Sequence, residues 1–383
     1  MLALPPAPVP TVSVETNIAS LEREWRTLEA TGTSSVYQRY EWVSRWCEHV
    51  APSLEVEPRF YVLSRQDEIV GILPLGLHYM GPVGILTNLS DSHTNFVGGV
   101  FCPTFSRSAT ADLMVSVRDA ILEADQAAEG LSLCCIPGEW NGVPNPLRFW
   151  FSNDSAHDAW ACDLSQGFDA LLDAGSGKRK RKKHRHAARK FDDAGGWRVV
   201  RPETDAEATA MFAEACSLMA TRFETAGIRD PFAPQEVRSF MRDTLARSIG
   251  NEAPTMSIWA LEVSGERIAW QAGGISGNTL SLMFTVFDPT RYEKLGPGDF
   301  LLYEVLQDAA ERGISQLDLG RGSEPYKLSW CNRRIPLSDA RIGRTTRATI
   351  LLSAHRQATA LKKRVREDER LWAIAKRVRR LAA

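Results

Sequence analysis

Residues 288–322 read DPTRYEKLGPGDFLLYEVLQDAAERGISQLDLGRG, and this stretch decides the expected fold. A strand-like run at 279–287 precedes it, a Gly-Pro-Gly loop lies at 296–298, and an amphipathic helix follows the loop directly. The helical pattern ends at Gly313, after which 314–319 reads as a second strand. This order of strand, loop, helix and strand predicts an α/β fold.

The Gly-Pro-Gly loop has the composition of a phosphate-binding loop. Glycines before a helix let backbone N–H groups turn toward one point, and the helix N-terminus adds partial positive charge. Short glycine motifs also occur as plain strand-to-helix connections, so the loop alone leaves both interpretations open.

Length and charge bound the class of protein. The 383 residues exceed one ordinary domain and predict two. The net charge of −1 hides two basic segments: 178–190 has nine Lys/Arg and no acid, and 341–383 has thirteen Lys/Arg against three acids. Basic segments on an acidic remainder favour contact with a polyanion or with the protein's own acidic face. Three interpretations of 178–190 stay open: a solvated helix, contact with an anionic partner, or a targeting signal; the charge pattern differs from that of a uniformly basic nucleic-acid binder.

Cysteine usage and the apolar segments indicate a cytoplasmic protein. The seven cysteines show no C-x-x-C and no metal-ligand spacing, which predicts reduced thiols and no metal site. The N-terminus lacks a basic region followed by an apolar core, so no signal peptide is expected. The uncharged segment 69–90 contains Pro74, Pro82 and four glycines, which favours two buried strands over a membrane span. Peripheral contact of a basic segment with the inner membrane face stays open.

The two halves of the chain share one plan. Predicted helices lie at 18–29, 40–50 and 113–128, and predicted strands at 60–63, 69–77 and 131–136. The strands 257–263 and 268–275 repeat the first strand pair, and 302–319 repeats the helix–glycine–strand rhythm of 117–136. We infer a weak internal duplication with halves meeting near 160–170. Because only the second copy has the glycine loop, one active site per chain is expected.

Four segments of the C-terminal half resemble the GNAT acyltransferase superfamily, in particular its tandem-lobed branch associated with bacterial polysaccharide (cellulose) biosynthesis. They are the basic helix 178–190, the strands 259–263 and 268–275, the loop 291–299, and GRGSEPYKLSW at 320–330. The arrangement also resembles the Fem-type aminoacyltransferases. The resemblance implies an α/β fold with mixed sheets in two GNAT-like lobes: a degenerate lobe at 11–162, an acyltransferase lobe with the cofactor loop at 163–345, and a basic extension at 346–383. A basic helix is expected at 358–381, packed on the acidic body.

The resemblance also implies a cofactor site. In GNAT proteins the coenzyme A pyrophosphate sits on a Q/R-x-x-G-x-G/A loop; here both glycines match, but Glu293 replaces the leading Gln or Arg. Arg291 and Lys294 can supply the missing positive charge. The strand before the loop would offer backbone N–H groups to the acyl carbonyl. The implied contacts are Phe284, Thr285, Val286, Arg291, Lys294, Leu295, Gly296, Pro297, Gly298 and Asp299.

Acyl transfer from a thioester needs a held carbonyl, a deprotonated nucleophile and a protonated leaving thiolate. We expect Tyr326 to protonate the thiolate, Glu324 to accept a proton from the acceptor, and Lys327 to stabilise the oxyanion or a phosphate; the Fem-like resemblance favours Lys327. Two structural alternatives stay open: Tyr326 packs on Trp330, and Glu324 pairs with Arg321.

Further polar residues are candidates for contact with the acceptor. Asp91 and His93, in a polar loop, and Arg321 form this set. Asp318 alternates with two leucines, so it faces either the site or solvent, and solvent is the preferred interpretation.

The predicted function is an N-acyltransferase that moves an acetyl or other acyl group from acyl-CoA, as co-substrate, to an amine on a sugar or small metabolite in polysaccharide or envelope biosynthesis. One alternative is a Fem-like transferase that draws its acyl group from aminoacyl-tRNA, which the basic helix at 178–190 suits. The other is a non-catalytic GNAT-derived scaffold, which Glu293 suits.

Overall fold

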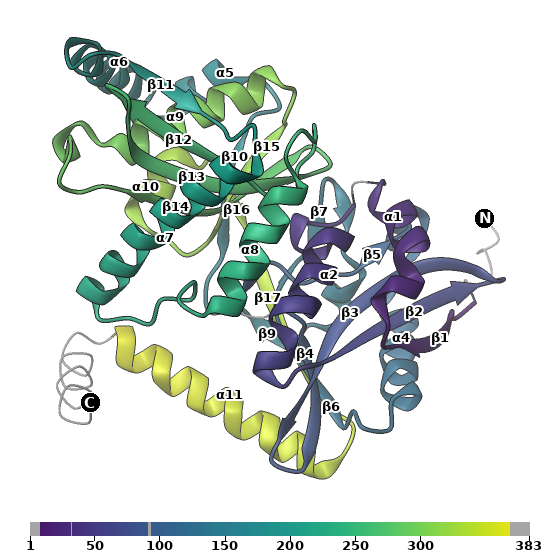
Figure 1. The fold of residues 1–383 in the computed structure, drawn as a ribbon. Helices are drawn as coiled ribbons and strands as arrows, with labels where there is room; N and C mark the ends of the chain where they lie inside the picture. The colour runs from purple at the N-terminus through teal and green to yellow at the C-terminus, as the bar shows by residue number, and fades with distance from the viewer. Residues whose placement is uncertain (1–7, 32, 91–92, 368–383) are drawn as a thin grey trace, which may run out of the picture.

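The computed structural model describes residues 8–31, 33–90 and 93–367, which form two lobes, each built on a mixed β-sheet (Figure 1). The N-terminal lobe has the strand order β1 (Thr11–Glu15), β2 (Glu57–Arg65), β3 (Glu68–Met80), β4 (Val83–Asn88), β6 (Gly130–Pro137), β17 (Leu337–Gly343) and β9 (Asn153–Asp154), with β5 (Val100–Phe101) beside β3. The C-terminal lobe has the order β11 (Trp197–Val200), β12 (Ser257–Val263), β13 (Glu266–Ser276), β14 (Thr279–Phe287), β15 (Gln316–Arg321), β10 (Ala159–Asp163) and β16 (Arg333–Ile335). The predicted mixed α/β class is confirmed.

The two sheets repeat one topology and exchange a strand. In each, antiparallel strands lead to one parallel pair, β4 with β6 and β14 with β15. The strand after that pair comes from the other half of the chain: β17 pairs with β6, and β10 pairs with β15. The predicted boundaries at 162/163 and 345/346 therefore do not coincide with the sheets, because each half lends a strand to its neighbour.

The N-terminal lobe carries the helices expected from the sequence, together with a short helix at 103–108 that was not predicted. A 3-10 turn, η1 (Ile18–Leu21), leads into α1 (Glu22–Glu29); α2 (Tyr40–His49), α3 (Pro103–Ser108) and α4 (Ala111–Ala124) follow. The segment 69–90 forms β3 and β4, as predicted. Within the described ranges, no helix is long and apolar enough to cross a membrane.

The helices of the C-terminal lobe cover both faces of its sheet. They are α5 (Phe168–Asp173), α6 (Gly177–Asp193), α7 (Asp205–Ala226), α8 (Gln235–Arg247), α9 (Pro297–Glu311) and α10 (Pro325–Trp330). The helix α9 packs through Leu301 and Val305 into one apolar cluster, whereas α7 packs through Phe212 into another. The second cluster also contains Trp42 from α2 and Phe240 from α8, so the lobes share a core.

The last described helix, α11 (Thr346–Glu367), starts earlier than the predicted basic helix at 358–381. The Thr345 hydroxyl accepts a hydrogen bond from the Ala348 amide (3.2 Å), which caps the helix. Arg347 pairs with the buried carboxylate of Glu129 and fixes α11 to the N-terminal lobe. Residues 368–381 of the predicted helix lie outside the described part of the chain.

Candidate functional site

The parallel strands β14 and β15 separate partway along their length. They pair only over residues 279–281 and 316–318. Just beyond, β14 carries a bulge against β13: Leu282 opposes Gly273 and Phe284 opposes Ala272, so Met283 is the extra residue. Within the described residues, the edge of β14 that faces β15 therefore has no strand partner beyond Ser281, and this gap between the paired strands is called the opening below.

The N-terminus of α9 lies beside this opening, and two lysines of α6 lie near it. Gly296 precedes the helix with φ +68° and no side-chain cap. A Cβ on Gly296 would lie 2.9 Å from the Lys183 ammonium, which itself pairs with Asp299 at 2.9 Å. Asp299 also accepts a hydrogen bond from the Trp330 indole (2.6 Å), and the Lys180 ammonium lies 3.4 Å from the centre of that ring. Two lysines of the basic segment 178–190 thus stand at the predicted cofactor loop.

The loop amides do not converge as the sequence analysis expected. The amides of Leu295, Gly296 and Asp299 donate to the carbonyls of Tyr292, Glu293 and Gly296, at 2.8, 2.9 and 3.1 Å. These N–H groups donate within two consecutive tight turns, η6 (Glu293–Leu295) and the start of α9. Among the described residues no partner is found for the Gly298 amide. Positive potential at the loop therefore comes from the helix end and from Lys180 and Lys183, with Asp299 held in place by these contacts.

Two further predicted cofactor contacts are Arg291 and Lys294. Arg291 pairs with Glu266 and with Asp288, so its guanidinium is engaged on the β13 side. Lys294 and Glu293 are both exposed. The acid that replaces the family's Gln or Arg thus has room to face solvent instead of a phosphate.

The three predicted catalytic residues lie on or next to α10, at the end of β15. Lys327 is buried; its ammonium donates to the Arg321 carbonyl and lies 3.0 Å from the Glu324 carboxylate. Tyr326 is 42% exposed. Partial burial and the charge of Glu324 raise the pKa of Tyr326 to about 12, which keeps it protonated at neutral pH. The Glu324 carboxylate thus has Lys327 as its ion-pair partner, and the Trp330 indole N–H donates its hydrogen bond to the Asp299 carboxylate.

Arg222 is a site residue that the sequence analysis missed. It lies on α7, for which no prediction was made, and its guanidinium donates to the Thr285 carbonyl (3.2 Å) on the open edge of β14. The same charge acts to lower the pKa of Tyr326, against the effect of burial, so Arg222 stands near both the strand and α10. The opening is therefore bordered by a cation from a third element.

Asp318 is buried beneath the opening, contrary to the preferred sequence interpretation. It lies on β15 directly opposite Ser281 and has no exposed surface. One carboxyl oxygen accepts a hydrogen bond from the Gly320 amide (2.7 Å), and the other has no partner within the described ranges. Burial raises the pKa of Asp318 to about 7. The approach of the N-terminal lobe to β15 excludes the solvent that alternation alone would have allowed.

The N-terminal lobe completes the site through an inter-lobe cavity of about 60 Å³. The cavity is lined by Tyr37, Trp42, His93, Thr94, Asn95, Phe232, Met241 and Met283. The Asn95 side chain lies so close to β15 that a Cβ on Gly320 would be 2.6 Å from its nitrogen. Arg321 donates to the Cys135 sulfur and the Thr94 carbonyl, so it joins the two lobes here. Of the predicted acceptor contacts, His93 and Arg321 thus lie at the interface, whereas Asp91 is outside the described residues.

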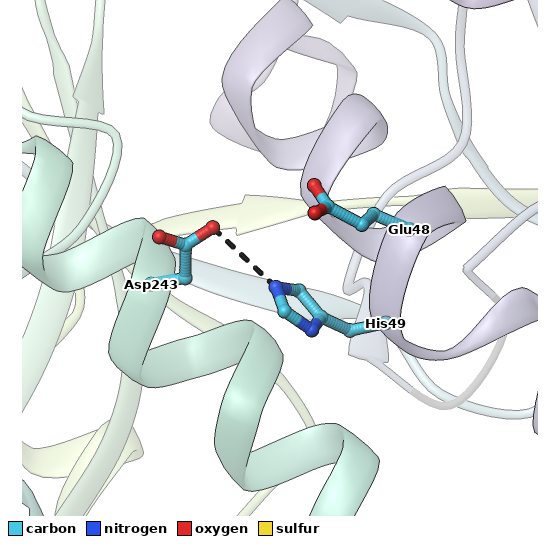
Figure 2. Close-up of side chains that lie close together, drawn as sticks. All are labelled: Glu48, His49 and Asp243. Atoms are coloured by element: carbon cyan, nitrogen blue, oxygen red, sulfur yellow. Dashed lines mark hydrogen bonds and ion pairs between the residues drawn. The ribbon is translucent and has the colours of Figure 1, made fainter.

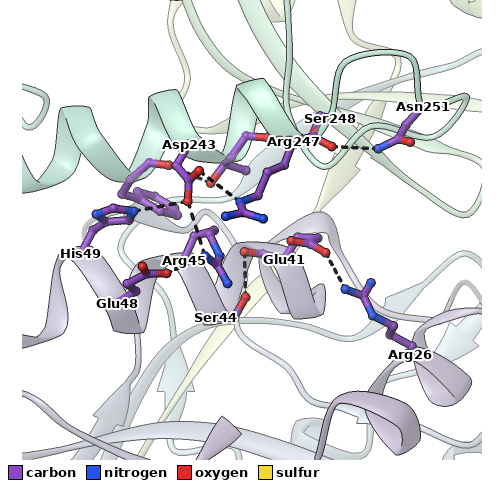
Figure 3. Close-up of polar contacts among 12 residues, drawn as sticks. Arg26, Glu41, Ser44, Arg45, Glu48, His49, Asp243, Arg247, Ser248 and Asn251 are labelled. Atoms are coloured by element: carbon purple, nitrogen blue, oxygen red, sulfur yellow. Dashed lines mark hydrogen bonds and ion pairs between the residues drawn. The ribbon is translucent and has the colours of Figure 1, made fainter. Parts of the chain in front are cut away.

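A second inter-lobe cluster joins α2 to α8. Glu48, His49 and Asp243 offer three ligand-type atoms within 4.8 Å of one another (Figure 2). Arg45 contacts both carboxylates, at 2.5 Å for Glu48 and 3.5 Å for Asp243, and Arg247 contacts Asp243 at 3.1 Å (Figure 3). Two guanidinium groups already neutralise the acids, so the cluster acts as an ion-pair connection between the lobes and is poorly suited to a cation.

A surface depression of about 760 Å³ lies along β11, β12, α7 and the middle of α9. Its charged lining is paired internally, as in Arg201 with Asp308 and Arg198 with Glu262. The lining has three arginines and five acids, so its net charge is negative and does not favour an anionic ligand, which sets the depression apart from the lysine-rich loop.

Comparisons with known proteins agree with this architecture. A family model described as an acetyltransferase (GNAT) domain matches residues 178–328, which run from α6 to α10. FemX has a similar structure (12% identity, TM-score 0.59, covering 86% of this chain and 97% of FemX). A conserved protein of unknown function from Bacteroides thetaiotaomicron VPI-5482 also has a similar structure (12% identity, TM-score 0.56, covering 87% of this chain and 100% of that protein). A third is the C-terminal domain of a putative lysylphosphatidylglycerol synthetase from Agrobacterium fabrum (12% identity, TM-score 0.52, covering 90% of this chain and 97% of that domain).

A search of curated proteins finds no match. Because the structural similarities come at 12% identity, they establish the fold and leave the substrates open. The chain is a two-lobed protein of mixed α/β sheets that repeat one topology, and residues 178–328 of its C-terminal lobe match the GNAT acetyltransferase domain.

Proposed function

We propose that the C-terminal lobe is an acyltransferase that moves an acyl group, acetyl in the simplest case, from acyl-CoA to an amine on a sugar or small metabolite. One observation carries the proposal: β14 and β15 separate next to a helix N-terminus flanked by two lysines, with a bulge at the point of separation. This arrangement places a positively charged site that can bind an anion next to an open strand edge. An N-acylated sugar for an envelope polysaccharide is a product consistent with this chemistry.

The donor phosphates would bind at the start of α9. Lys180, Lys183 and the Gly298 amide supply the positive end, and a diphosphate would replace Asp299 as the partner of Lys183. The thioester would then lie along β14, where backbone N–H groups near the bulge at Met283 can donate to its carbonyl. One such donor typically contributes about 3 kcal/mol of barrier lowering.

The transfer step uses the groups on α10. The acceptor nitrogen attacks the thioester carbon, the carbon–sulfur bond breaks, and the departing thiolate takes a proton from Tyr326, whose raised pKa keeps that proton available. The proton lost by the acceptor nitrogen passes to Glu324 directly or through water. Lys327, buried and bonded to the Arg321 carbonyl, would hold the end of β15 in position and present positive charge to the oxyanion.

Aminoacyl-tRNA is the second candidate donor. The outer face of α6 carries exposed cations that have no acidic partner among the described residues, namely Lys178, Arg179, Lys182, Arg185 and Arg189. Fem-type enzymes, which the chain resembles in fold, use this donor, and a phosphodiester backbone would suit such a row of charges.

Ligand-induced thermal stabilisation separates the proposals. Acetyl-CoA at a hundred times its dissociation constant should stabilise the protein by about 2.7 kcal/mol, and thiol release with a panel of amines should follow. A tRNA affinity that falls steeply with salt, without any response to coenzyme A, would favour the second donor. A response to neither ligand would contradict both and leave the scaffold interpretation.

A further inference from the structure

The inter-lobe cavity lies at the bulge of β14, on the face opposite α9. The bulge places two consecutive side chains, Met283 and Phe284, on this face: Met283 lines the cavity, and Phe284 packs edge-on against Phe232 at 5.6 Å. Met283 is also the residue at which β14 leaves β15. A group held by the open edge of β14 and pointing away from α9 would therefore enter this cavity.

The polar groups that line the cavity are already bonded to one another or to the protein around them. The Asn95 amide donates to the Tyr37 hydroxyl (2.9 Å), and the Trp46 indole donates to His93 (3.2 Å). Thr94 accepts from Arg321 through its carbonyl and donates to the Phe96 carbonyl through its hydroxyl. The surface left for an occupant is mainly that of aromatic rings and methionines, which suits a hydrocarbon better than a hydroxyl or an ammonium group.

The walls of the cavity are fixed by packing from both lobes. Trp42 is fully buried and stacks edge-on with Phe240 of α8 at 4.8 Å, and Tyr37 packs edge-on against Trp42 at 5.2 Å. Met241, on the same helix as Phe240, is the flexible aliphatic part of the wall. Shortening Met241 should thus enlarge the space while the aromatic frame stays in place.

The volume limits what the cavity can hold. A dry protein cavity of roughly 150 Å³ accommodates benzene, which corresponds to about 25 Å³ for each carbon. By this scale a cavity of about 60 Å³ takes about two or three carbons. That matches the carbons of an acetyl or propionyl group, whereas a hexanoyl chain would not fit.

We propose that the inter-lobe cavity receives the acyl group of the donor, restricts it to two or three carbons, and is closed by Met241. This inference rests on the proposed acyl-CoA function and adds donor chain length to it. Chain-length selection would then be a property of the lobe interface, since Tyr37 and Trp42 come from the N-terminal lobe and Met241 and Met283 from the C-terminal lobe.

The test measures binding and needs no knowledge of the acceptor. Dissociation constants are determined by calorimetry for 2-oxoalkyl thioethers of coenzyme A that mimic acyl groups of two, three, four and six carbons. The full chain is compared with Met241→Ala and with the milder Met241→Val. The matched control is Met219→Ala, which truncates another buried methionine of the same apolar cluster that does not line the cavity.

The wild-type protein should bind the two- and three-carbon analogues at least tenfold more tightly than the six-carbon analogue, because one methylene in an apolar pocket gives discrimination of about tenfold or more. Met241→Ala should remove most of this preference, Met241→Val should reduce it, and Met219→Ala should leave it unchanged. An unchanged preference in folded Met241 variants, or an equal loss in Met219→Ala, overturns the inference alone. If the wild-type protein binds none of the analogues, the acyl-CoA proposal fails and the inference falls with it.

Discussion

The parallel pair of the N-terminal lobe is closed, whereas that of the C-terminal lobe is open. In the first, β4 and β6 pair over residues 85–87 and 130–132, and the next residue, Asn88, bridges the strands by donating to the Cys134 carbonyl (3.2 Å) and accepting from the Cys134 amide (3.1 Å). In the second, the residue after the last pair is Leu282, which has no polar group to form such a bridge. The two sheets share one topology and differ in the side chain that directly follows the last paired residues. Asn88 joins its two parallel strands there, whereas Leu282 does not, and the strand edge beside Leu282 stays open to a ligand.

The helices α4 and α9, which connect the two strands of each parallel pair, also differ at their N-termini. The N-terminal helix α4 is capped by Thr110, whose hydroxyl accepts a hydrogen bond from the Leu113 amide (3.3 Å). The N-cap residue of α9 is Gly296, which offers no side-chain cap, and Lys183 lies beside this end of the helix. The N-terminal lobe thus satisfies its own helix end, and the C-terminal lobe keeps a positive end for an anion.

The largest expected effect concerns α10, which follows β15. In the N-terminal lobe β6 is followed instead by a short hairpin of β7 (Glu139–Trp140) with β8 (Val143–Pro144). Replacing Tyr326→Phe should lower kcat about 1000-fold with little change in donor affinity, because the thiolate loses its proton donor. Tyr303→Phe, which changes a tyrosine stacked on His184, is the control and should stay near wild type. Unchanged kcat in Tyr326→Phe would remove Tyr326 from the mechanism.

The next effect tests the positive end of α9. The double variant Lys180→Ala and Lys183→Ala should weaken acyl-CoA binding about 100-fold, since two charge-assisted contacts are lost near solvent. Lys190→Ala removes a charge from the same helix, but its partner is Asp193, so donor affinity should hardly change. Calorimetric titration compares the three proteins, and equal weakening in both variants would indicate a general charge effect instead of a specific site.

The buried carboxyl beneath the opening predicts a pH dependence. The pKa of Asp318, about 7, lies above the value of 3.8 expected in the unfolded chain, so the folded protein holds this proton more tightly. Its contribution to stability is therefore complete below about pH 4 and is lost as the pH rises to about 7. Asp318→Asn should remove about 2 kcal/mol of this decline in the free energy of unfolding. Denaturation at pH 4.5 and pH 7.5 checks this; parallel behaviour of the two proteins would contradict it.

The smallest expected effect opens the closed lobe. Asn88→Leu copies Leu282 and leaves the Cys134 amide and carbonyl without their side-chain partner, which should cost about 1–2 kcal/mol of stability. Donor affinity should not change, because the N-terminal lobe lacks the lysines that flank α9. Urea unfolding and calorimetry measure both quantities; an undiminished stability would show that the Asn88 bridge does not matter.

The sequence predicted the elements whose signals are local. The Gly-Pro-Gly turn, the helix after it and the alternating strands on either side depend on neighbouring residues, and the structure has all of them as α9, β14 and β15. The basic segment 178–190 was likewise expected as a helix and forms α6. The tandem plan also followed, because the same helix–glycine–strand rhythm occurs twice.

Features that depend on distant contacts could not be predicted. The exchange of β10 and β17 is set by pairing between halves, which no local pattern encodes. The burial of Asp318 depends on how the N-terminal lobe covers β15, and the internal bonding of the Leu295 and Gly296 amides depends on the tight turn at η6. Arg222 was missed because α7 was not identified, so nothing linked this residue to the open edge of β14.

A crystal structure with a non-hydrolysable acetyl-CoA analogue tests the central claim most directly. The account predicts the diphosphate within hydrogen-bonding distance of the Lys183 ammonium at the start of α9, and the acyl mimic beside Met283. A ligand bound in the depression along β11 and β12, or a diphosphate that leaves the contact between Lys183 and Asp299 intact, would contradict it.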